Sequence, residues 1–495
     1  MTINKKNIIN KLVIDIRLPG DQKQHDDKSD RVKAAVLDGI FSFAQNYTGR
    51  LSDKIYRTDF LQINIMVHQE KWSDIADEVE QQLKEHFLQT GEPLLQFQGA
   101  RKPGKVTEVK QLTAGQKSEE HLFYYLKHGF YPWWSGNFEG MKVTDTLLAE
   151  CSVDFWELKL RPLLKDYPVA VERIVKQFSE QANRRVMILA TGEESVANKA
   201  TGFTDEVEKF LKKRPGSFPD GFIEKVITSV RVHLLKYFLD KRGKLTGSAE
   251  SRFMEAATDV FLKMVPLNTC YEWIESLENN KASNRKKWAE SAKKQLQAYT
   301  GKPAKYFSEN EKKEERNVIA AVTEEGDFNV SQSGLVLLHP YISRLFEKNG
   351  YLEDGLFRSD EARERAVCLL HYLATGENEY PEPELMLPMH LCSWPAGIPV
   401  NRFLTLSDYE KEECSRLLKS TIEHWQALKN TSEDGLRVNF LMRNGLLKRG
   451  EFGWTLHIEH KTHDVLLNML PWGISIIKFK WMSEHLAVDW KNSLR

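Results

Sequence analysis

Amphipathic segments separated by glycine and proline fill the middle of the chain, and this pattern constrains the fold more than any other. Between residues 145 and 295 the segments include WELKLRPLLKDYPVAVERIVKQFS, FIEKVITSVRVHLLKYFLDKRG and SRFMEAATDVFLKMV. Each places apolar residues at helical spacing over about 10 to 18 residues. Helices of that length are marginally stable alone, so they are expected to pack against one another. We therefore predict a packed helical region over residues 119–280.

Strand and helix patterns alternate near the N-terminus. In chain order they cover residues 11–18, 31–47, 59–67 and 73–87. The first and third segments, KLVIDIRL and DFLQINIMV, alternate apolar and polar side chains, as half-buried strands do. The other two carry apolar residues at helical spacing. This order predicts a small β-α-β-α domain over residues 1–96, and a polar linker over residues 97–118 follows it.

The last third of the chain indicates helices followed by a small sheet. Helical spacing recurs over residues 333–350, 359–376 and 408–428. Ser359 and Ser407 stand where a hydroxyl group caps the start of the second and third of these helices. Strand patterns follow in GWTLHIEHK, SIIKFKWM and HLAVDW. We predict a C-terminal domain over residues 331–495, and an α+β fold that is predominantly α-helical for the whole chain.

A basic segment separates the two folded regions. Residues 281–317 carry 11 Lys and Arg against 5 Glu and few large apolar residues. This balance predicts a linker over residues 281–330. Its run NRKKWAESAKK, around Trp288, is interpreted as a solvated face of the linker in preference to a nucleic-acid contact.

Charge and cysteine content limit the classes of function. The chain has 70 Lys and Arg against 70 Asp and Glu, so it lacks the basic surplus that favours nucleic-acid binding. No apolar run reaches the length of a signal-peptide core or of a membrane span, so we expect neither export nor a membrane partner. The five cysteines form no CxxC pair, and their odd number indicates buried free thiols in a reduced, cytoplasmic chain.

No motif predicts catalysis or cofactor binding. A GxGxxG after a strand, a GxxxxGK[ST] and a G-x-S-x-G are all absent from the sequence. Two sets of potential metal ligands occur, His457, His460 and His463 in HIEHKTH, and His371, His390 and Cys392. In a strand, the first two histidines of HIEHKTH lie on opposite faces, so surface histidines are the stronger interpretation. The second set is interpreted as packing or surface residues, and we predict no catalytic, cofactor-binding or metal-binding residue.

Several ordered motifs carry a family resemblance. The last third contains SGLVLLHPYISRLFEKNGYLEDGLF, EARERAVCLLHYLATGENEYPEPELMLPMHLCSWP, TIEHWQALKNTSEDGLRVNFLMRNGLLKR and GWTLHIEHKTHDVLLNMLPWGISIIKFKWM. The first half contains IYRTDFLQINI and LFYYLKHGFYPWW. In this order the motifs resemble the contractile injection system tape measure proteins, which are encoded with phage-tail-like contractile particles of bacteria. The resemblance covers roughly residues 8–190 and 333–490, and LPWGISIIKFKWM is its most specific piece.

The resemblance implies a non-enzymatic assembly protein. Such a protein sets the length of the inner tube and is tied to the spike or baseplate, so tube, spike or baseplate proteins are the implied partners, and a homo-oligomer is left open. It implies work in the cytoplasm during assembly, and a place inside the particle is left open. The first alternative is a globular baseplate-associated adaptor or chaperone. The weakest alternative is an enzyme that uses a metal at HIEHKTH.

Length bears on these alternatives. As one continuous helix, the chain would reach about 740 Å at 1.5 Å per residue. Its aromatic segments, interrupted by glycine and proline, indicate folded regions instead. The chain therefore sets only a short tube length by its own span, acts in several copies, or is an adaptor.

Four residues are the candidate contacts for a partner protein. Trp133, Trp134, Pro471 and Trp472 form aromatic-proline elements, which suit flat protein surfaces when they are exposed. The alternative is that all four belong to the core, since tryptophan is common in both settings.

Overall fold

A computed structural model describes most of the chain. The described residues are 25–47, 55–57, 73–88, 110–112, 114–131, 140–214, 218, 221–241, 257–263, 265–279, 283–299, 327–395, 397–428, 430–450 and 453–490. Contacts divide the chain into two compact units, one formed by residues 1–121 and 134–138 and one by residues 122–133 and 139–495. The predicted strands 11–18 and 59–67 lie outside the described residues.

The described part of the first unit contains a helical hairpin and a two-stranded sheet. Its elements are α1 (His25–Tyr47), β1 (Ile55–Arg57), α2 (Ser73–Leu88) and β2 (Lys110–Leu112). Phe43 of α1 packs against Ile75, Val79 and Leu83 of α2, which confirms the two predicted helices. Strand β2 pairs antiparallel with β1, although it comes from the segment predicted as a polar linker. The alternation of helices and strands in the described residues is therefore α-β-α-β.

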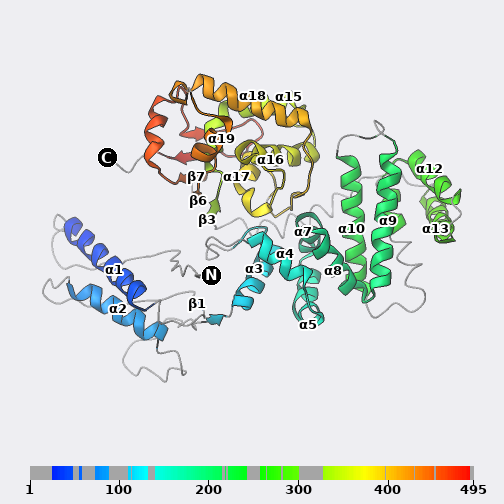
Figure 1. The fold of residues 1–495 in the computed structure, drawn as a ribbon, viewed down its shortest axis with the longest axis horizontal. Helices are drawn as coiled ribbons and strands as arrows, with labels where there is room; N and C mark the ends of the chain where they lie inside the picture. The colour runs from blue at the N-terminus through cyan, green and yellow to red at the C-terminus, as the bar shows by residue number, and fades with distance from the viewer. Residues whose placement is uncertain are drawn as a thin grey trace. The chain divides into compact units, whose positions relative to one another are not determined.

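The middle of the chain is a packed helical region, as predicted. Its helices are α3 (Ala114–His128), α4 (Gly140–Ala149), α5 (Val153–Phe155), the π-helical turn η3 (Trp156–Leu160), α6 (Arg161–Asp166), α7 (Pro168–Gln177), α8 (Glu180–Thr191), α9 (Glu194–Lys212), α10 (Phe222–Lys241), α12 (Leu267–Glu278) and α13 (Ser283–Tyr299). Figure 1 shows the green helices α9 and α10 side by side, and their contacts agree. Trp156, Phe203 and Trp273 are among its fully buried side chains.

Local signals explain where these helices begin and end. The hydroxyl of Ser179 accepts a hydrogen bond from the backbone N–H of Ala182 at 3.3 Å and caps α8. Gly192 ends the same helix with a φ of 78°, a left-handed conformation that glycine adopts without steric cost. Pro168 stands in the first turn of α7, where its missing N–H is no loss.

Helix α13 lies inside the segment predicted as a basic linker. Trp288, Ala289, Ala292 and Leu296 form its buried stripe, and the indole of Trp288 packs edge-on against Phe203 with 5.3 Å between ring centroids. The linker prediction therefore does not describe residues 283–299. The prediction was wrong there because it relied on the number of basic residues, and these lie on the exposed face of the helix. The packing of the helix depends instead on its narrow apolar stripe.

The C-terminal region contains helices and a five-stranded sheet. The strands are β3 (Asp327–Val330), β6 (Gly445–Gly450), β7 (Gly453–Ile458), β8 (Ile476–Ile477) and β9 (Leu486–Asp489). Their order in the sheet is β3-β6-β7-β9-β8, with β7 and β9 parallel and the other pairs antiparallel. The predicted terminal strands are thus confirmed. The sheet is larger than predicted, because β6 and the earlier strand β3 join it.

Helices and short turns cover this sheet and build its core. They are η4 (Ser333–Leu338), α15 (His339–Lys348), α16 (Asp360–Thr375), η5 (Glu382–Glu384), α17 (Met386–Leu391), α18 (Asp408–His424), α19 (Glu433–Leu436), the π-helical turn η7 (Arg437–Leu441) and η8 (Thr462–Met469). Ser359 and Ser407 cap α16 and α18 as predicted. The observed fold is predominantly α-helical with a small terminal sheet, which confirms the predicted class.

Two further properties of the described residues bear on function. All five cysteines are buried and free. Across the part of the chain that the structure describes, no helix combines the length and the apolar character that a membrane crossing needs.

Candidate functional site

The structure describes two of the four predicted partner contacts. Trp133 and Trp134 lie outside the described residues. Pro471 is exposed and follows Leu470, the residue that caps the end of η8. Trp472 is half-buried, and its indole N–H donates a hydrogen bond to the backbone carbonyl of Leu337 at 2.9 Å. The ring therefore anchors this turn to the C-terminal core and leaves Pro471 at the surface.

Exposed apolar side chains surround that turn in the sequence. Val465, Met469 and Ile476 have exposed fractions of 62%, 57% and 65%. Ile476 belongs to β8, which lies at the edge of the described sheet. We call residues 465–476 the exposed segment. The exposed segment has apolar side chains at the surface, and its strand β8 forms an edge of the described sheet. Both features are common in protein-binding surfaces.

A buried polar cluster, which we call the junction, joins the helical region to the C-terminal region. Arg173 of α7 and Glu382 of η5 are its centre, and their side chains are 0% and 1% exposed. The guanidinium binds the carboxylate with two hydrogen bonds, from Nε at 2.8 Å and from Nη2 at 3.1 Å. Its remaining donors reach the backbone carbonyls of Leu126 and Gly397 at 2.6 and 2.7 Å. A buried charge is tolerated only when it is paired and bonded in this way.

Two neighbouring side chains complete the junction. The hydroxyl of Tyr125 donates to Gln177 Oε1 at 3.2 Å and lies 3.4 Å from a Glu382 carboxylate oxygen. The amide of Gln177 donates to the carbonyl of Val400 at 2.7 Å and accepts from the Glu382 backbone N–H at 2.9 Å. Burial raises the pKa of the Glu382 carboxyl, and the Arg173 guanidinium opposes that shift. Burial also raises the pKa of Tyr125, so its phenol stays protonated.

Gly129 shows why the GFYPWW motif begins with glycine. It follows α3 with a φ of 83°, in the left-handed region that favours glycine. A Cβ at this position would lie 2.9 Å from Arg173 Nη2 and also against the Glu382 carboxylate. No pattern in the local sequence indicates this contact between Gly129 and the ion pair.

Further polar contacts surround the junction. The Lys176 ammonium donates to the carbonyl of Pro399 at 3.0 Å, and the backbone N–H of Arg402 donates to the carbonyl of Lys176 at 3.1 Å. Ion pairing between Lys225 and Glu361 adds a contact from α10. Hydrogen bonds and ion pairs therefore contribute to the contact between the helical region and the C-terminal region.

The three histidines of HIEHKTH do not form a common site. His457 Nδ1 lies 3.0 Å from Asp489 Oδ2, and His463 Nε2 lies 2.9 Å from the carbonyl of Asn439. His460 Nδ1 lies 3.7 Å from Asp464 Oδ2. Each imidazole therefore has a different polar neighbour.

The second set of potential ligands, His371, His390 and Cys392, does not form a common site either. His371 Nδ1 is 2.6 Å from Gln332 Nε2, whereas the His390 ring packs edge-on against Trp454 with 5.1 Å between centroids. Among the described residues, potential metal ligands converge instead at His371, Glu377 and Glu384. The sequence spacing of His371, Glu377 and Glu384 does not match a known metal-binding motif, so the sequence pattern did not predict this set.

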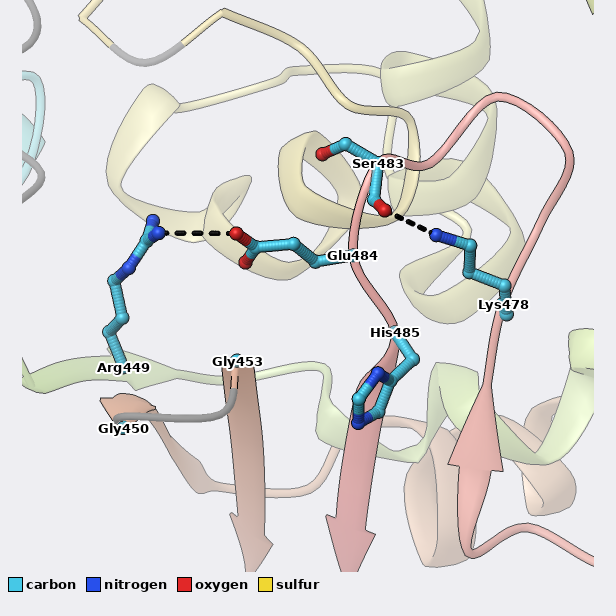
Figure 2. A pocket seen from close by; sticks show the side chains of 7 residues that line it. All are labelled: Arg449, Gly450, Gly453, Lys478, Ser483, Glu484 and His485. Atoms are coloured by element: carbon cyan, nitrogen blue, oxygen red, sulfur yellow. Dashed lines mark hydrogen bonds and ion pairs between the residues drawn. The ribbon is translucent and has the colours of Figure 1, made fainter.

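An open pocket of about 630 Å³ lies at one end of the sheet (Figure 2). Arg449, Gly450 and Gly453 of the β6–β7 hairpin line one side, and Lys478 with residues 483–485 lines the other. Its cations already have partners, because Arg449 pairs with Glu484 at 3.2 Å and Lys478 donates to the carbonyl of Ser483 at 2.5 Å. The pocket therefore offers no concentrated charge for a ligand.

Comparison with known proteins gives one match. A family model described as contractile injection system tape measure protein matches residues 6–490. No curated protein matches the chain, and no solved structure does. The matched range includes the helical region, the junction and the C-terminal region, and it agrees with the resemblance of the sequence motifs.

Proposed function

The chain belongs to the contractile injection system tape measure proteins, and from that membership we propose a non-enzymatic assembly protein that sets the length of the inner tube and links the tube to the baseplate. The family match over residues 6–490 carries the proposal, because it extends over nearly the whole chain.

The packed cores support length control by a folded protein. A single helix of the whole chain would reach about 740 Å at 1.5 Å per residue. Extension to that length would expose the apolar cores of both the helical and the C-terminal regions and separate Arg173 from Glu382. A chain that stays folded spans a short distance, or acts in several copies along the tube.

The proposed partners are tube, spike or baseplate proteins, which the chain meets in the cytoplasm during assembly. Trp133, Trp134, Pro471 and Trp472 remain the proposed contacts. The exposure of Pro471 and Ile476 supports this choice, whereas the half-buried Trp472 holds the exposed segment in place.

Shortening the helical region tests length control. Removal of residues 267–299, which include α12 and α13, is expected to give shorter tubes in electron micrographs. Trp288→Ala is the matched control, because it loosens the same packing against Phe203 at full chain length. Shorter tubes with the deletion but not with Trp288→Ala support length control by this protein. Particles of unchanged length, or no effect of deleting the whole gene, contradict it.

A baseplate-associated adaptor or chaperone is the second candidate. The buried ion pair of the junction favours it, because Arg173 and Glu382 meet only while the helical region and the C-terminal region are both folded. An adaptor is expected to copurify with baseplate proteins at fixed stoichiometry. The deletion would then reduce the number of particles without changing tube length.

A further inference from the structure

Three potential metal ligands converge where α16 ends. His371 lies near the end of this helix, Glu377 follows its glycine cap, and Glu384 is the last residue of η5. Their ligand atoms all lie within 4.8 Å of one another. Gly376 allows this arrangement, because its φ of 79° ends the helix and turns the chain directly before Glu377.

The imidazole of His371 is a buried ligand without a full set of partners. Its side chain is 0% exposed, and Nε2 has no hydrogen-bond partner. Nδ1 lies 2.6 Å from the side-chain amide of Gln332, whose Oε1 also lacks a partner. If that amide turns by 180°, Oε1 accepts a hydrogen bond from Nδ1–H and the lone pair of Nε2 is free. Metal-bound histidines are usually oriented by such a bond to the other ring nitrogen.

The carboxylates of Glu377 and Glu384 lie close to each other at this cluster. Arg402 is a cation near Glu384. The guanidinium of Arg402 is already occupied, since it pairs with Glu379 at 2.6 Å and donates to the carbonyl of Gln177 at 3.3 Å. Within the described residues, neither Glu377 nor Glu384 makes an ion pair through its side chain. The cluster thus brings together two carboxylate groups and the His371 ring, whose Nε2 has no hydrogen-bond partner.

We propose that His371, Glu377 and Glu384 bind one divalent transition-metal ion, with Zn²⁺ as the preferred ion. One imidazole and two carboxylates are suitable ligands for zinc and leave a position for water. Calcium and magnesium prefer oxygen ligands alone, so they bind more weakly. A metal here connects the end of α16 to η5, the turn that also carries Glu382 of the junction.

Zinc binding to the full chain tests the proposal. Equilibrium dialysis against ZnCl₂ followed by elemental analysis is expected to give one tightly bound ion per chain, and X-ray absorption is expected to show only nitrogen and oxygen ligands. Glu377→Gln and Glu384→Gln each remove one charged ligand from an exposed position, so the fold is retained. Each is expected to weaken binding by at least about tenfold, and the double variant to abolish it.

Two control variants distinguish this site from surface binding. Glu379→Gln removes an equal charge from the same loop, and it is expected to keep the ion. His460→Gln alters the exposed HIEHKTH cluster and is also expected to keep it. The proposal is overturned if the wild-type chain binds no zinc, if the double variant binds as much zinc as wild type, or if only His460→Gln loses the ion.

Discussion

Arg173 and Glu382 are 209 residues apart in the sequence, yet they form a fully buried, two-bond ion pair. One residue comes from the helical region and the other from the C-terminal region. Each leaves a buried charge if the other is removed, so the pair makes the two regions depend on each other for stability.

Removing the charge of Glu382 is expected to destabilise the protein strongly. Glu382→Gln leaves the Arg173 guanidinium buried without a counter-charge, which costs about 3 to 5 kcal/mol. The matched control is Glu194→Gln, because Glu194 pairs with Arg184 at the surface, with side chains 63% and 54% exposed. An exposed pair contributes at most about 1 kcal/mol. Urea unfolding followed by circular dichroism compares the two, and equal midpoints would contradict the role given to the junction.

Glycine at position 129 is expected to be irreplaceable. Gly129→Ala forces a Cβ into a left-handed backbone and against the Arg173 and Glu382 side chains. Gly202→Ala is the control, because Gly202 lies inside α9 with no atom near the added Cβ. Alanine there favours the helix by up to about 1 kcal/mol. The thermal unfolding temperature should therefore fall for Gly129→Ala and rise for Gly202→Ala. An unchanged unfolding temperature for Gly129→Ala would show that the neighbouring side chains can move to accommodate the Cβ.

Two variants in the exposed segment are expected to have different effects, one on the stability of the protein and the other on particle assembly. Trp472→Phe loses the indole donor to Leu337, so the unfolding midpoint should fall by the equivalent of about 1 kcal/mol. Ile476→Ser changes an exposed side chain and should alter stability by no more than about 0.5 kcal/mol. If the segment binds a partner, this variant still lowers the number of particles in electron micrographs. Normal particle numbers with Ile476→Ser would remove Ile476 from the contact.

His390 is expected to make stability depend on pH. Burial, aided by the charge of Arg449, lowers its pKa to about 4, against about 6.5 in an unfolded chain. Between these values the unfolded chain binds a proton that the folded chain does not bind. Stability therefore falls as the pH falls from about 6.5 to about 4, by up to about 3 kcal/mol from this residue. His390→Gln should lessen that dependence in urea unfolding at several pH values, and identical pH profiles would exclude His390 as its source.

Local patterns predicted much of the fold because local forces determine it. Ser359 and Ser407 cap helices, since a hydroxyl before an apolar periodic segment satisfies a free backbone N–H. Strand β7 alternates clearly and was predicted. Strand β3 was not predicted, because its four residues lie at the end of a polar, charged stretch and gain their order from pairing with β6.

The candidate sites depended on contacts that no local pattern records. Glu382 stands in a proline-rich turn, and nothing nearby indicates that Arg173 will neutralise it. The His371, Glu377 and Glu384 cluster similarly depends on the glycine that ends α16 and on a separate turn. For Trp472, the sequence left core and surface both open, and the structure gives it features of each.

The pairing of β3 with β6 also affects the order of events during synthesis. Phe328 of β3 lies opposite Leu447 of β6, and β3 has no other partner among the described strands. At translation rates of about 5 to 20 residues per second, β3 waits on the order of 10 seconds before its partner is made. The helical region can fold on the ribosome in that interval, whereas the sheet closes only when β9 has emerged. A nascent chain therefore presents its helical region to chaperones or partners well before its C-terminal region is ready to bind.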